Sequence, residues 1–371
     1  MGPGGLGTLT LLGLAFLAAA FGVARRSRWP ATVACAALSF VVAAAFGIGS
    51  VNRYYGYYDT WTALATDLQA ENGATALPVQ IPLAPGVVPA RNVDSRLRPD
   101  LDPWSLRRLA LPGGASGVRG RQALVVLPPP SLRHGPVPVL LFLHGEPGSP
   151  PTLTTGLRLV TALQRQAALG RIGAMAVVIP DVRGSVPNQQ CLDVAHRSAL
   201  ATWLRTEVPG DLTTQLDVKP PGRAWAVAGL SEGGFCAADL ALHEPGTYAG
   251  AAEIDGYNEP DLSHGIFRKA FGGRRERVAA DSPREVVRRW PAQRRLPAFW
   301  LMAGTGNVAD YRDAVSFATL LGRRADPRFV TVEGGRHTKP AWLTALPDML
   351  RWAWLTTSGH PSGGSVDLPL R

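Results

Sequence analysis

The sequence predicts an α/β fold, a mostly parallel sheet with helices on both faces, preceded by an N-terminal transmembrane helical hairpin. Three observations lead to this prediction. Two long apolar runs precede residue 52, short apolar runs alternate with helix-like stretches after residue 104, and a glycine-flanked serine joins one such run to a helix. The expected parts are two membrane helices (1–51), a tether (52–103), one α/β domain (104–358) and a flexible tail (359–371).

The two apolar runs span residues 6–24 and 31–51, and each is long enough to cross a hydrocarbon core as a helix. The loop between them holds three arginines and a proline: Arg25, Arg26, Arg28 and Pro30. By the positive-inside rule this loop stays in the cytoplasm. A cleaved signal peptide is the alternative, but its positive charge precedes the apolar stretch, whereas here the charge follows it. We therefore expect a two-helix plasma-membrane protein with an extracytoplasmic domain.

An aromatic-rich segment follows the second apolar run. Rings at this distance from a membrane span are typical of an interfacial belt, and the alternative is a buried patch of the next domain. The segment comprises Tyr54, Tyr55, Tyr57, Tyr58 and Trp61. Polar and Pro-containing sequence continues from there to residue 103 and predicts a tether.

The part after residue 104 has the pattern of an α/β domain. Runs 106–111 and 122–127 flank a Gly-rich loop and are expected to pair as antiparallel strands at a sheet edge. Later apolar runs of the buried-strand type are 137–143, 175–179, 224–228, 251–254, 298–302 and 329–332. Helix-like stretches between them are 153–168, 196–206, 232–243 and 311–323. Such alternation predicts a parallel sheet covered on both faces.

A candidate nucleophile follows the strand at 224–228. The chain reads Gly-Leu-Ser-Glu-Gly-Gly from Gly229 to Gly234 and then enters a helix-like stretch. A strand, a Gly-x-Ser-x-Gly turn and a helix form a nucleophile elbow, which holds its serine in a strained conformation at the carboxyl edge of the sheet. The pattern therefore predicts that Ser231 is a catalytic nucleophile.

The serine requires a base, and in this arrangement the acid and then the histidine follow it in the chain. Three histidines lie well downstream: His264, His337 and His360. His337 lies one short loop beyond the last predicted strand, where a side chain can overhang the carboxyl edge. We expect His337 to be the base; the alternative is an ordinary polar loop residue.

The orienting acid is expected in the loop after the strand at 298–302. Asp310 and Asp313 can both supply the carboxylate. Asp310 is the first choice, although helix capping would also explain an aspartate there. Asp313 falls one turn into the next helix, where its side chain is expected to face solvent. A Gly-x-Gly-x-x-Ala match in the same loop is too late in the chain to predict a dinucleotide site.

Two backbone amides should form the oxyanion hole. One belongs to the residue after the nucleophile, Glu232, and the other to an early strand-to-helix loop, where Glu146 follows His144-Gly145. The sequence gives no reason why both positions carry carboxylates.

These features resemble the putative-esterase branch of the α/β-hydrolase superfamily, which includes S-formylglutathione hydrolase-like esterases and secreted mycolyltransferases. The resemblance covers about residues 121–354. It rests on His144-Gly145, Pro180-Asp181, the elbow with Gly234 and Cys236, and Gly-Gly-x-His followed by Trp342. The Tyr-rich segment also resembles membrane-anchored relatives from GC-rich Gram-positive bacteria. Such families often place the acid at the position that Asn307 occupies here. Because asparagine is not an acid, the resemblance does not say which residue orients His337.

Cysteine usage is consistent with export. Cys35 lies within the second apolar run, which leaves Cys191 and Cys236 as an even pair in the exported part. We expect these two to form a disulfide; the alternative is two separate buried thiols. The cysteine and histidine spacing does not predict a metal site.

The sequence therefore predicts a membrane-anchored, outward-facing serine hydrolase that cleaves an ester through an acyl-enzyme, with no metal or organic cofactor. The substrate is an ester, and a lipid or an envelope glycan is a possible source of it. The alternatives are an acyltransferase with the same residues and an inactive envelope protein that retains the fold. Net charge is +10, but lysine is restricted to Lys219, Lys269 and Lys339, so the composition argues against nucleic-acid binding.

The stretch 268–295 is strongly basic, with nine arginines and Lys269. It is interpreted either as a basic lid over an anionic lipid or envelope polymer, or as a solvated helical face, and the second interpretation is favoured.

Overall fold

The computed structural model of this 371-residue chain describes residues 4–25, 29–55, 61, 104–186, 188–325 and 327–359. The chain divides into two compact units, an N-terminal helical one and a larger one that holds the sheet. The predicted tether and tail lie outside the described residues, except for 52–55, 61 and 359. Their predicted roles stay predictions.

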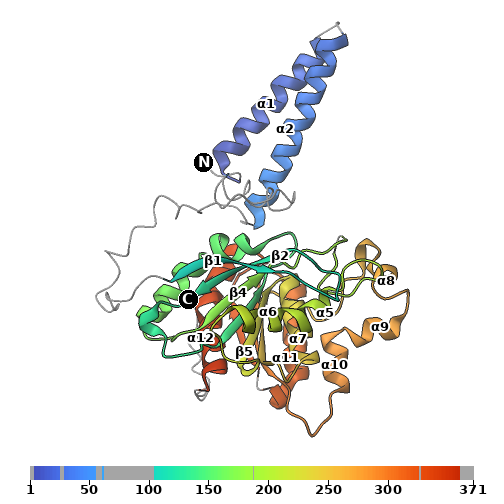
Figure 1. The fold of residues 1–371 in the computed structure, drawn as a ribbon. Coiled ribbons are helices and arrows are strands. Elements are labelled where there is room, and N and C mark those ends of the chain that lie inside the picture. Colours follow the sequence, from blue (N-terminus) through green and yellow to red (C-terminus); the bar gives the residue numbers. More distant parts are fainter. Residues whose placement is uncertain are drawn as a thin grey trace. The chain divides into compact units, whose positions relative to one another are not determined.

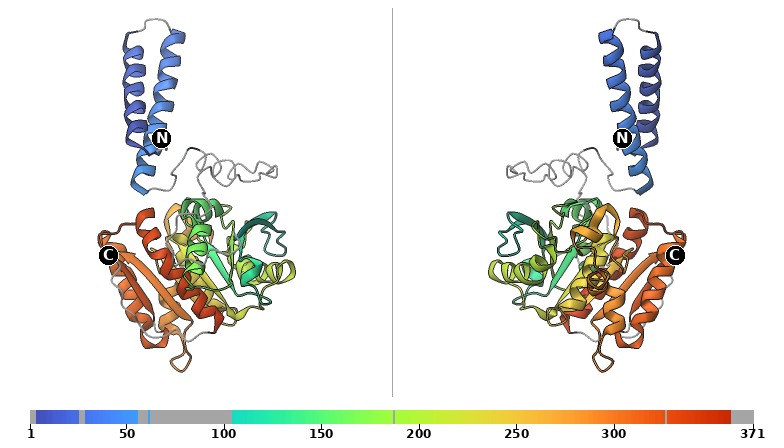
Figure 2. Two further views of the ribbon diagram at one scale, coloured as in Figure 1. Left: turned by 90° about the vertical axis from the view of Figure 1, so that its left-hand side faces the viewer. Right: turned by 90° about the vertical axis from the view of Figure 1, so that its right-hand side faces the viewer.

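The N-terminal unit consists of α1 (Leu6–Arg25) and α2 (Trp29–Tyr55), which lie side by side in Figures 1 and 2. Many of the apolar side chains described in these helices are exposed; Phe40, for example, is 77% exposed. Among the described residues, the segment Val33–Arg53 is long and apolar enough to cross a membrane, whereas Leu6–Ala19 is shorter. One predicted membrane helix thus has the necessary length, and the second crossing stays a prediction. Helix α2 also extends four residues beyond the predicted end at residue 51.

The larger unit contains one sheet of eight strands in the order β1-β2-β4-β3-β5-β6-β7-β8. Strands β1 and β2 pair antiparallel, β2 joins β4 antiparallel, and the pairs from β4 to β8 are parallel, as predicted. The strands are β1 Ser105–Leu111, β2 Arg121–Leu127, β3 Val139–Leu143, β4 Ala176–Pro180, β5 Gly222–Leu230, β6 Tyr248–Ile254, β7 Ala298–Gly304 and β8 Arg328–Val332. Winding reverses between β3 and β5, so a ligand site is expected outside their carboxyl ends.

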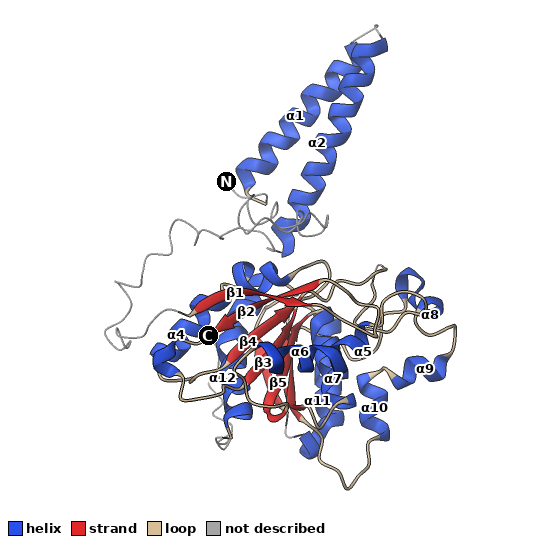
Figure 3. Ribbon diagram, viewed as in Figure 1, coloured by secondary structure: helices blue, strands red, loops and turns tan. Residues whose placement is uncertain are grey.

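Helices cover both faces of this sheet (Figure 3). Fully buried side chains of α6, α7, α10 and α11 pack on one face with alternate strand residues such as Leu141 and Val227. On the other face, the indole of Trp300 donates a hydrogen bond to Asp348 of α12 at 2.8 Å. The helices are α4 Leu159–Ala168, α5 Leu200–Thr202, α6 Val208–Gln215, α7 Glu232–His243, α8 Ile266–Lys269, α9 Arg275–Ala280, α10 Pro283–Arg289, α11 Val308–Ala325 and α12 Lys339–Ser358.

Two predicted helices have different bounds in the structure. The stretch predicted from 153 opens with a π-helical turn, and Arg158 has a φ of 51°, so α4 begins only at Leu159. The stretch predicted from 196 begins as a tight turn in which the Val194 amide donates to the carbonyl of Ser198. His196 has a φ of 60° in that turn, and regular helix starts at Leu200. In both places left-handed residues interrupt a pattern that has helical spacing.

The basic stretch forms α8, α9 and α10, which extend beside the sheet in Figure 1. Nine of its ten basic side chains are exposed, whereas Glu276 is its one exposed acid. The exception is Arg284, which is buried because it pairs with Asp313 at 2.6 Å and with Glu259 at 3.3 Å. The other cations lie in solvent, as a solvated helical face requires.

Candidate active site

Ser231 lies in a tight turn between β5 and α7, at the carboxyl edge of the sheet. Its φ of 56° and ψ of −118° are strained for a residue with a side chain. The flanking positions must be glycine because a side chain there would clash with the neighbouring backbone. A Cβ on Gly229 would lie 1.7 Å from the carbonyl oxygen of Gly233, and one on Gly233 would lie 2.3 Å from that of Leu143. The local sequence therefore folds as the predicted nucleophile elbow.

His337 reaches this serine from the loop after β8. Its Nε2 lies 2.9 Å from the Ser231 Oγ, within hydrogen-bond distance. The loop is held by close backbone contact with the loop after β7, since the Gly306 amide donates to the Gly335 carbonyl at 2.7 Å. A Cβ on Gly304 would lie 2.3 Å from the same carbonyl oxygen. Glycines at these positions thus allow two neighbouring loops to position the imidazole.

The structure brings Asp310 rather than Asp313 to this histidine. The Asp310 Oδ2 lies 3.8 Å from the His337 Nδ1, and it accepts a hydrogen bond from the Asn307 side chain. The Asn307 side chain thus contacts the carboxylate that lies one turn further along the chain. The Asp313 side chain is 39% exposed, as the prediction that it faces solvent requires, but its carboxylate also pairs with the buried Arg284 and accepts a hydrogen bond from Asn258.

The electrostatics of His337 suit a general base. Burial lowers the pKa of His337 below its usual 6.5, and the nearby Asp310 carboxylate opposes this shift only in part. The imidazole is therefore neutral at neutral pH and can accept a proton from the serine hydroxyl.

The loop after β3 passes against the nucleophile. A Cβ on Gly145 would lie 3.1 Å from the Ser231 Cβ. His144 fixes this loop, because the Val182 amide donates to its Nε2 at 3.1 Å, which leaves the proton on Nδ1, 2.9 Å from the Gly145 carbonyl oxygen. A trans peptide directs its C=O and N–H in opposite directions. The Glu146 amide is thus held pointing away from His144.

The carboxylates at the two expected oxyanion positions differ in burial. Glu146 is exposed, whereas Glu232 is only 8% exposed. Burial raises the pKa of Glu232 to about 8, the charges of Glu146 and Asp261 add to the shift, and a backbone hydrogen bond from Gln190 opposes it. Glu232 is therefore mostly protonated at neutral pH, so no full negative charge lies beside the amide at its own backbone.

The predicted disulfide between Cys191 and Cys236 is present, with a Cα–Cα distance of 5.8 Å. It joins the loop after β4 to the elbow helix α7. Residues Gln190 and Cys191 both have left-handed backbone angles, with φ of 54° and 55°. The bridge thus fixes the loop whose Gln190 amide contacts Glu232.

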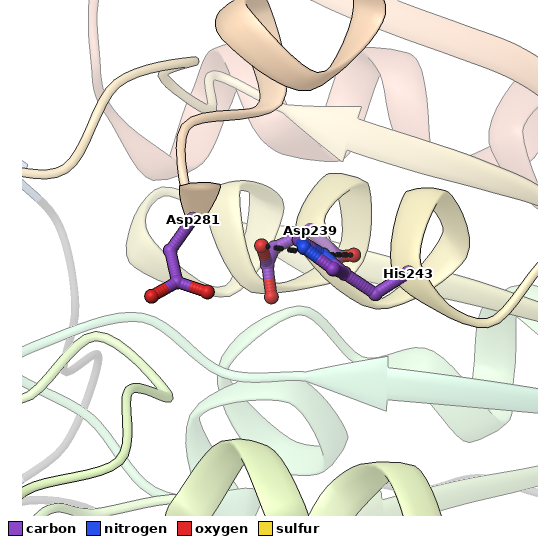
Figure 4. A group of neighbouring side chains, drawn as sticks. All are labelled: Asp239, His243 and Asp281. Atoms are coloured by element: carbon purple, nitrogen blue, oxygen red, sulfur yellow. Dashed lines mark hydrogen bonds and ion pairs between the residues drawn. The ribbon is translucent and has the colours of Figure 1, made fainter. Parts of the chain in front are cut away.

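A separate ionisable cluster lies farther along α7, where Asp239 and His243 face Asp281 (Figure 4). These donors could hold a metal ion by their spacing. The Arg205 guanidinium, however, lies 2.6 Å from Asp239 and 3.8 Å from Asp281, and the His243 Nδ1 lies 3.0 Å from Asp239. Because cationic and histidine partners already pair with both carboxylates, the cluster is explained as an ion-pair network that joins the loop before α10 to α7.

Solved structures with a similar fold are esterases and their relatives. A ferulic acid esterase is 18% identical, with a TM-score of 0.60, over 68% of this chain and 99% of that chain. An S-formylglutathione hydrolase from Agrobacterium tumefaciens is 18% identical, with a TM-score of 0.55, over 69% of this chain and 100% of that chain. MPT51 of Mycobacterium tuberculosis is 17% identical, with a TM-score of 0.51, over 67% and 99%. These likenesses show the α/β-hydrolase fold.

Sequence comparison extends this result. An uncharacterized protein of Corynebacterium glutamicum is 26% identical over 250 residues, which is 64% of this chain and 58% of the relative. The chain thus spans little more than half the length of that relative. The model of the family described as "Putative esterase" matches residues 118–353, close to the range of the resemblance seen in the sequence. Because this match covers more than half of the chain, the protein belongs to the "Putative esterase" family.

Proposed function

We propose that the protein is a membrane-anchored, extracytoplasmic serine esterase with Ser231, His337 and Asp310 as its catalytic triad. The observation that carries the proposal is the 2.9 Å contact between the Ser231 Oγ and the His337 Nε2, with the serine at a strained elbow. The contact joins residues 106 positions apart in the chain, so local structure alone does not explain it.

The chemistry follows from this geometry. Ser231 Oγ attacks the ester carbonyl carbon while His337 Nε2 takes the hydroxyl proton, and the backbone amides of Glu146 and Glu232 stabilise the oxyanion. Collapse of the tetrahedral intermediate breaks the ester C–O bond, and His337 returns the proton to the leaving alcohol. Water then attacks the acyl-enzyme, again with His337 as base, to release the acid and restore Ser231. The Asp310 carboxylate stabilises the imidazolium that forms in each half-reaction.

The location is supported by charge and by cysteine chemistry. The apolar segment Val33–Arg53 can act as an anchor, and a second crossing at 6–24 would leave the arginine-rich loop between the helices in the cytoplasm. A disulfide in the hydrolase unit fits an oxidising compartment. The ester is then one found at the cell envelope, with a lipid or a glycan as the acyl carrier or acceptor.

A fluorophosphonate probe tests the nucleophile on the full-length protein in detergent. We expect labelling at Ser231 and loss of both labelling and ester turnover in Ser231→Ala. Ser263→Ala is the matched control, because Ser263 also lies within hydrogen-bond distance of a histidine, His264 at 2.7 Å, but is exposed and not on an elbow. Labelling at Ser263, or none in folded protein, would refute the proposal.

Two further measurements test the rest of the proposal. A panel of acyl esters assayed with and without a sugar acceptor separates hydrolysis from acyl transfer, since only transfer yields an acylated sugar. A reporter fused after Arg371 should be active only in its exported form. Activity of a cytoplasmic reporter would refute the topology.

A further inference from the structure

A buried aspartate that the sequence analysis did not select lies at the end of β6. Asp255 is 4% exposed and has a left-handed φ of 49°. Its amide donates to the Met302 carbonyl of β7 at 3.0 Å, so the residue is fixed between the ends of two strands. A strained, buried acid at the carboxyl edge of the sheet is the kind of residue that serves a site, and the triad does not use it.

Asp255 connects to the catalytic histidine through one side chain. Its Oδ2 accepts a hydrogen bond from the indole nitrogen of Trp342 at 2.7 Å. Trp342 lies on α12 and is 1% exposed. Its ring meets the imidazole of His337 edge-on, with ring centroids 5.3 Å apart and an interplanar angle of 87°. Asp255, Trp342 and His337 therefore form a continuous series of contacts that ends at the base.

The contact with Asp310 does not by itself hold the orientation of the His337 ring. The Asp310 Oδ2 lies 3.8 Å from the His337 Nδ1, which is beyond hydrogen-bond distance. The carboxylate thus acts on the imidazole by charge, but this contact does not fix the ring plane. The hydrogen bond to Ser231 restrains one ring nitrogen, and the aromatic contact with Trp342 restrains the rotation of the ring about it.

We propose that Asp255 is a positioning residue, which anchors the indole of Trp342 and thereby holds the His337 imidazole in line with Ser231. This inference rests on the proposed function. Catalysis depends on such alignment, because a small misplacement of the base lowers the rate of proton transfer without changing the affinity for substrate.

The charge of Asp255 is not required for this role. Burial raises the pKa of Asp255 to about 7, hydrogen bonds from Trp342 and from the Gly304 backbone oppose the shift, and the Asp310 charge adds to it. A protonated carboxyl, a carboxylate and an asparagine amide oxygen all accept a hydrogen bond from an indole N–H. The conservative variant Asp255→Asn should therefore preserve the contact, whereas Asp255→Ala removes it.

The chain offers a matched control for the tryptophan. Trp300 is also fully buried, and its indole nitrogen also donates to an aspartate, Asp348, at 2.8 Å. Trp300→Phe and Trp342→Phe thus remove the same kind of bond from a fully buried indole; Asp348 differs from Asp255 in that it also pairs with Arg328 at 2.7 Å. Of these two indoles, that of Trp342 meets the His337 imidazole.

The test compares kcat and KM for a soluble aryl ester at equal folded concentration of full-length protein. We expect Trp342→Phe and Asp255→Ala to lower kcat by about 10-fold with KM changed by less than about 2-fold. Asp255→Asn and Trp300→Phe should stay within about 3-fold of the wild-type kcat. Folded concentration is measured by circular dichroism and by the thermal transition.

Two results would overturn the inference. One is a wild-type kcat in folded Trp342→Phe, which also decides the matter if Asp255→Ala fails to fold. The other is an equal loss in Trp300→Phe, which would assign the effect to general destabilisation. Wild-type protein that does not react with the fluorophosphonate probe would instead refute the proposed function, so the two failures are distinguishable.

Discussion

Replacement of Asp310 by asparagine keeps the shape of the side chain and removes its charge. In the proposed reaction His337 becomes an imidazolium, which the carboxylate would stabilise across the 3.8 Å between Nδ1 and Oδ2. Two unit charges at this distance attract by about 4 kcal/mol at an effective dielectric constant of about 20, and by about 1 kcal/mol in water. Because the Asp310 side chain is 39% exposed, we expect an intermediate loss of about 2 kcal/mol, or 10- to 100-fold in kcat.

The pH dependence of kcat/KM provides a second measurement on the same variant. His337 must be neutral to act as base, so activity rises with pH as the imidazole loses its proton. Burial already lowers the pKa of His337, and the Asp310 charge counteracts this. Removing the charge lowers this pKa further. The acid limb of Asp310→Asn should therefore move to lower pH, while its plateau falls.

Asp313→Asn is the matched control, because it makes the same chemical change three positions along α11. Asp313 pairs with Arg284, whose side chain is 7% exposed, and Glu259 remains as a second partner. We expect this variant to lose about 1–2 kcal/mol of unfolding free energy and to keep its kcat when folded. Near-wild-type turnover in Asp310→Asn, combined with lost turnover in Asp313→Asn, would refute the assignment. Retained turnover in both would place the acid outside this loop.

Three more predictions concern the surroundings of the site. Glu232→Gln should stabilise the protein at pH 7 by at most about 3 kcal/mol. Because the pKa of Glu232 in the folded protein, about 8, exceeds the usual 4.5, the unfolding free energy of the wild type falls as pH rises between these values. Denaturation at pH 5 and at pH 8 should therefore give different unfolding free energies for the wild type but not for the variant. Replacing both Cys191 and Cys236 by serine should lower the unfolding free energy by about 4 kcal/mol, because the disulfide closes a loop with a sequence separation of 45. Wild type and variant are compared by denaturation without reductant. Equal unfolding free energies would show that the bridge does not constrain the unfolded chain. Asn307→Ala should lower kcat by about 3-fold, because it removes the hydrogen bond that orients Asp310. This loss is smaller than the loss expected for Asp310→Asn. A larger loss would assign Asn307 a direct role.

Much of the fold could be predicted because its signals are local. Buried parallel strands are short continuous apolar runs, and each run identified in the sequence overlaps an observed strand. The elbow was predictable for the same reason, since Gly229 and Gly233 lie within two positions of Ser231. The bounds of helices α4 and α5 were not, because single left-handed residues such as Arg158 and His196 do not disturb helical spacing. The disulfide was predictable from the even number of cysteines after the apolar runs.

The environments of the acids required the tertiary structure. Asp313 has helical spacing that directs it toward solvent, but Arg284, 29 positions earlier, meets it there. Glu232 is buried and accepts a backbone hydrogen bond from Gln190, a residue far from it in the sequence, so no pattern around Glu232 predicts this environment. Asp255 and Trp342 were separate residues in the sequence and are hydrogen-bonded in the fold across 87 positions.

The sequence by itself thus determined the class of fold, the serine, the histidine that meets it and the cysteine pair, because periodicity, turn chemistry and chain order are properties of neighbouring residues or of their order. Only the tertiary structure decided which aspartate faces His337, how Asn307 contacts it, and that Asp255 reaches the imidazole through Trp342. These contacts depend on how far each loop extends beyond its strand and on where α12 returns to the sheet. Distances of a few ångströms between such loops are set by packing of the whole domain.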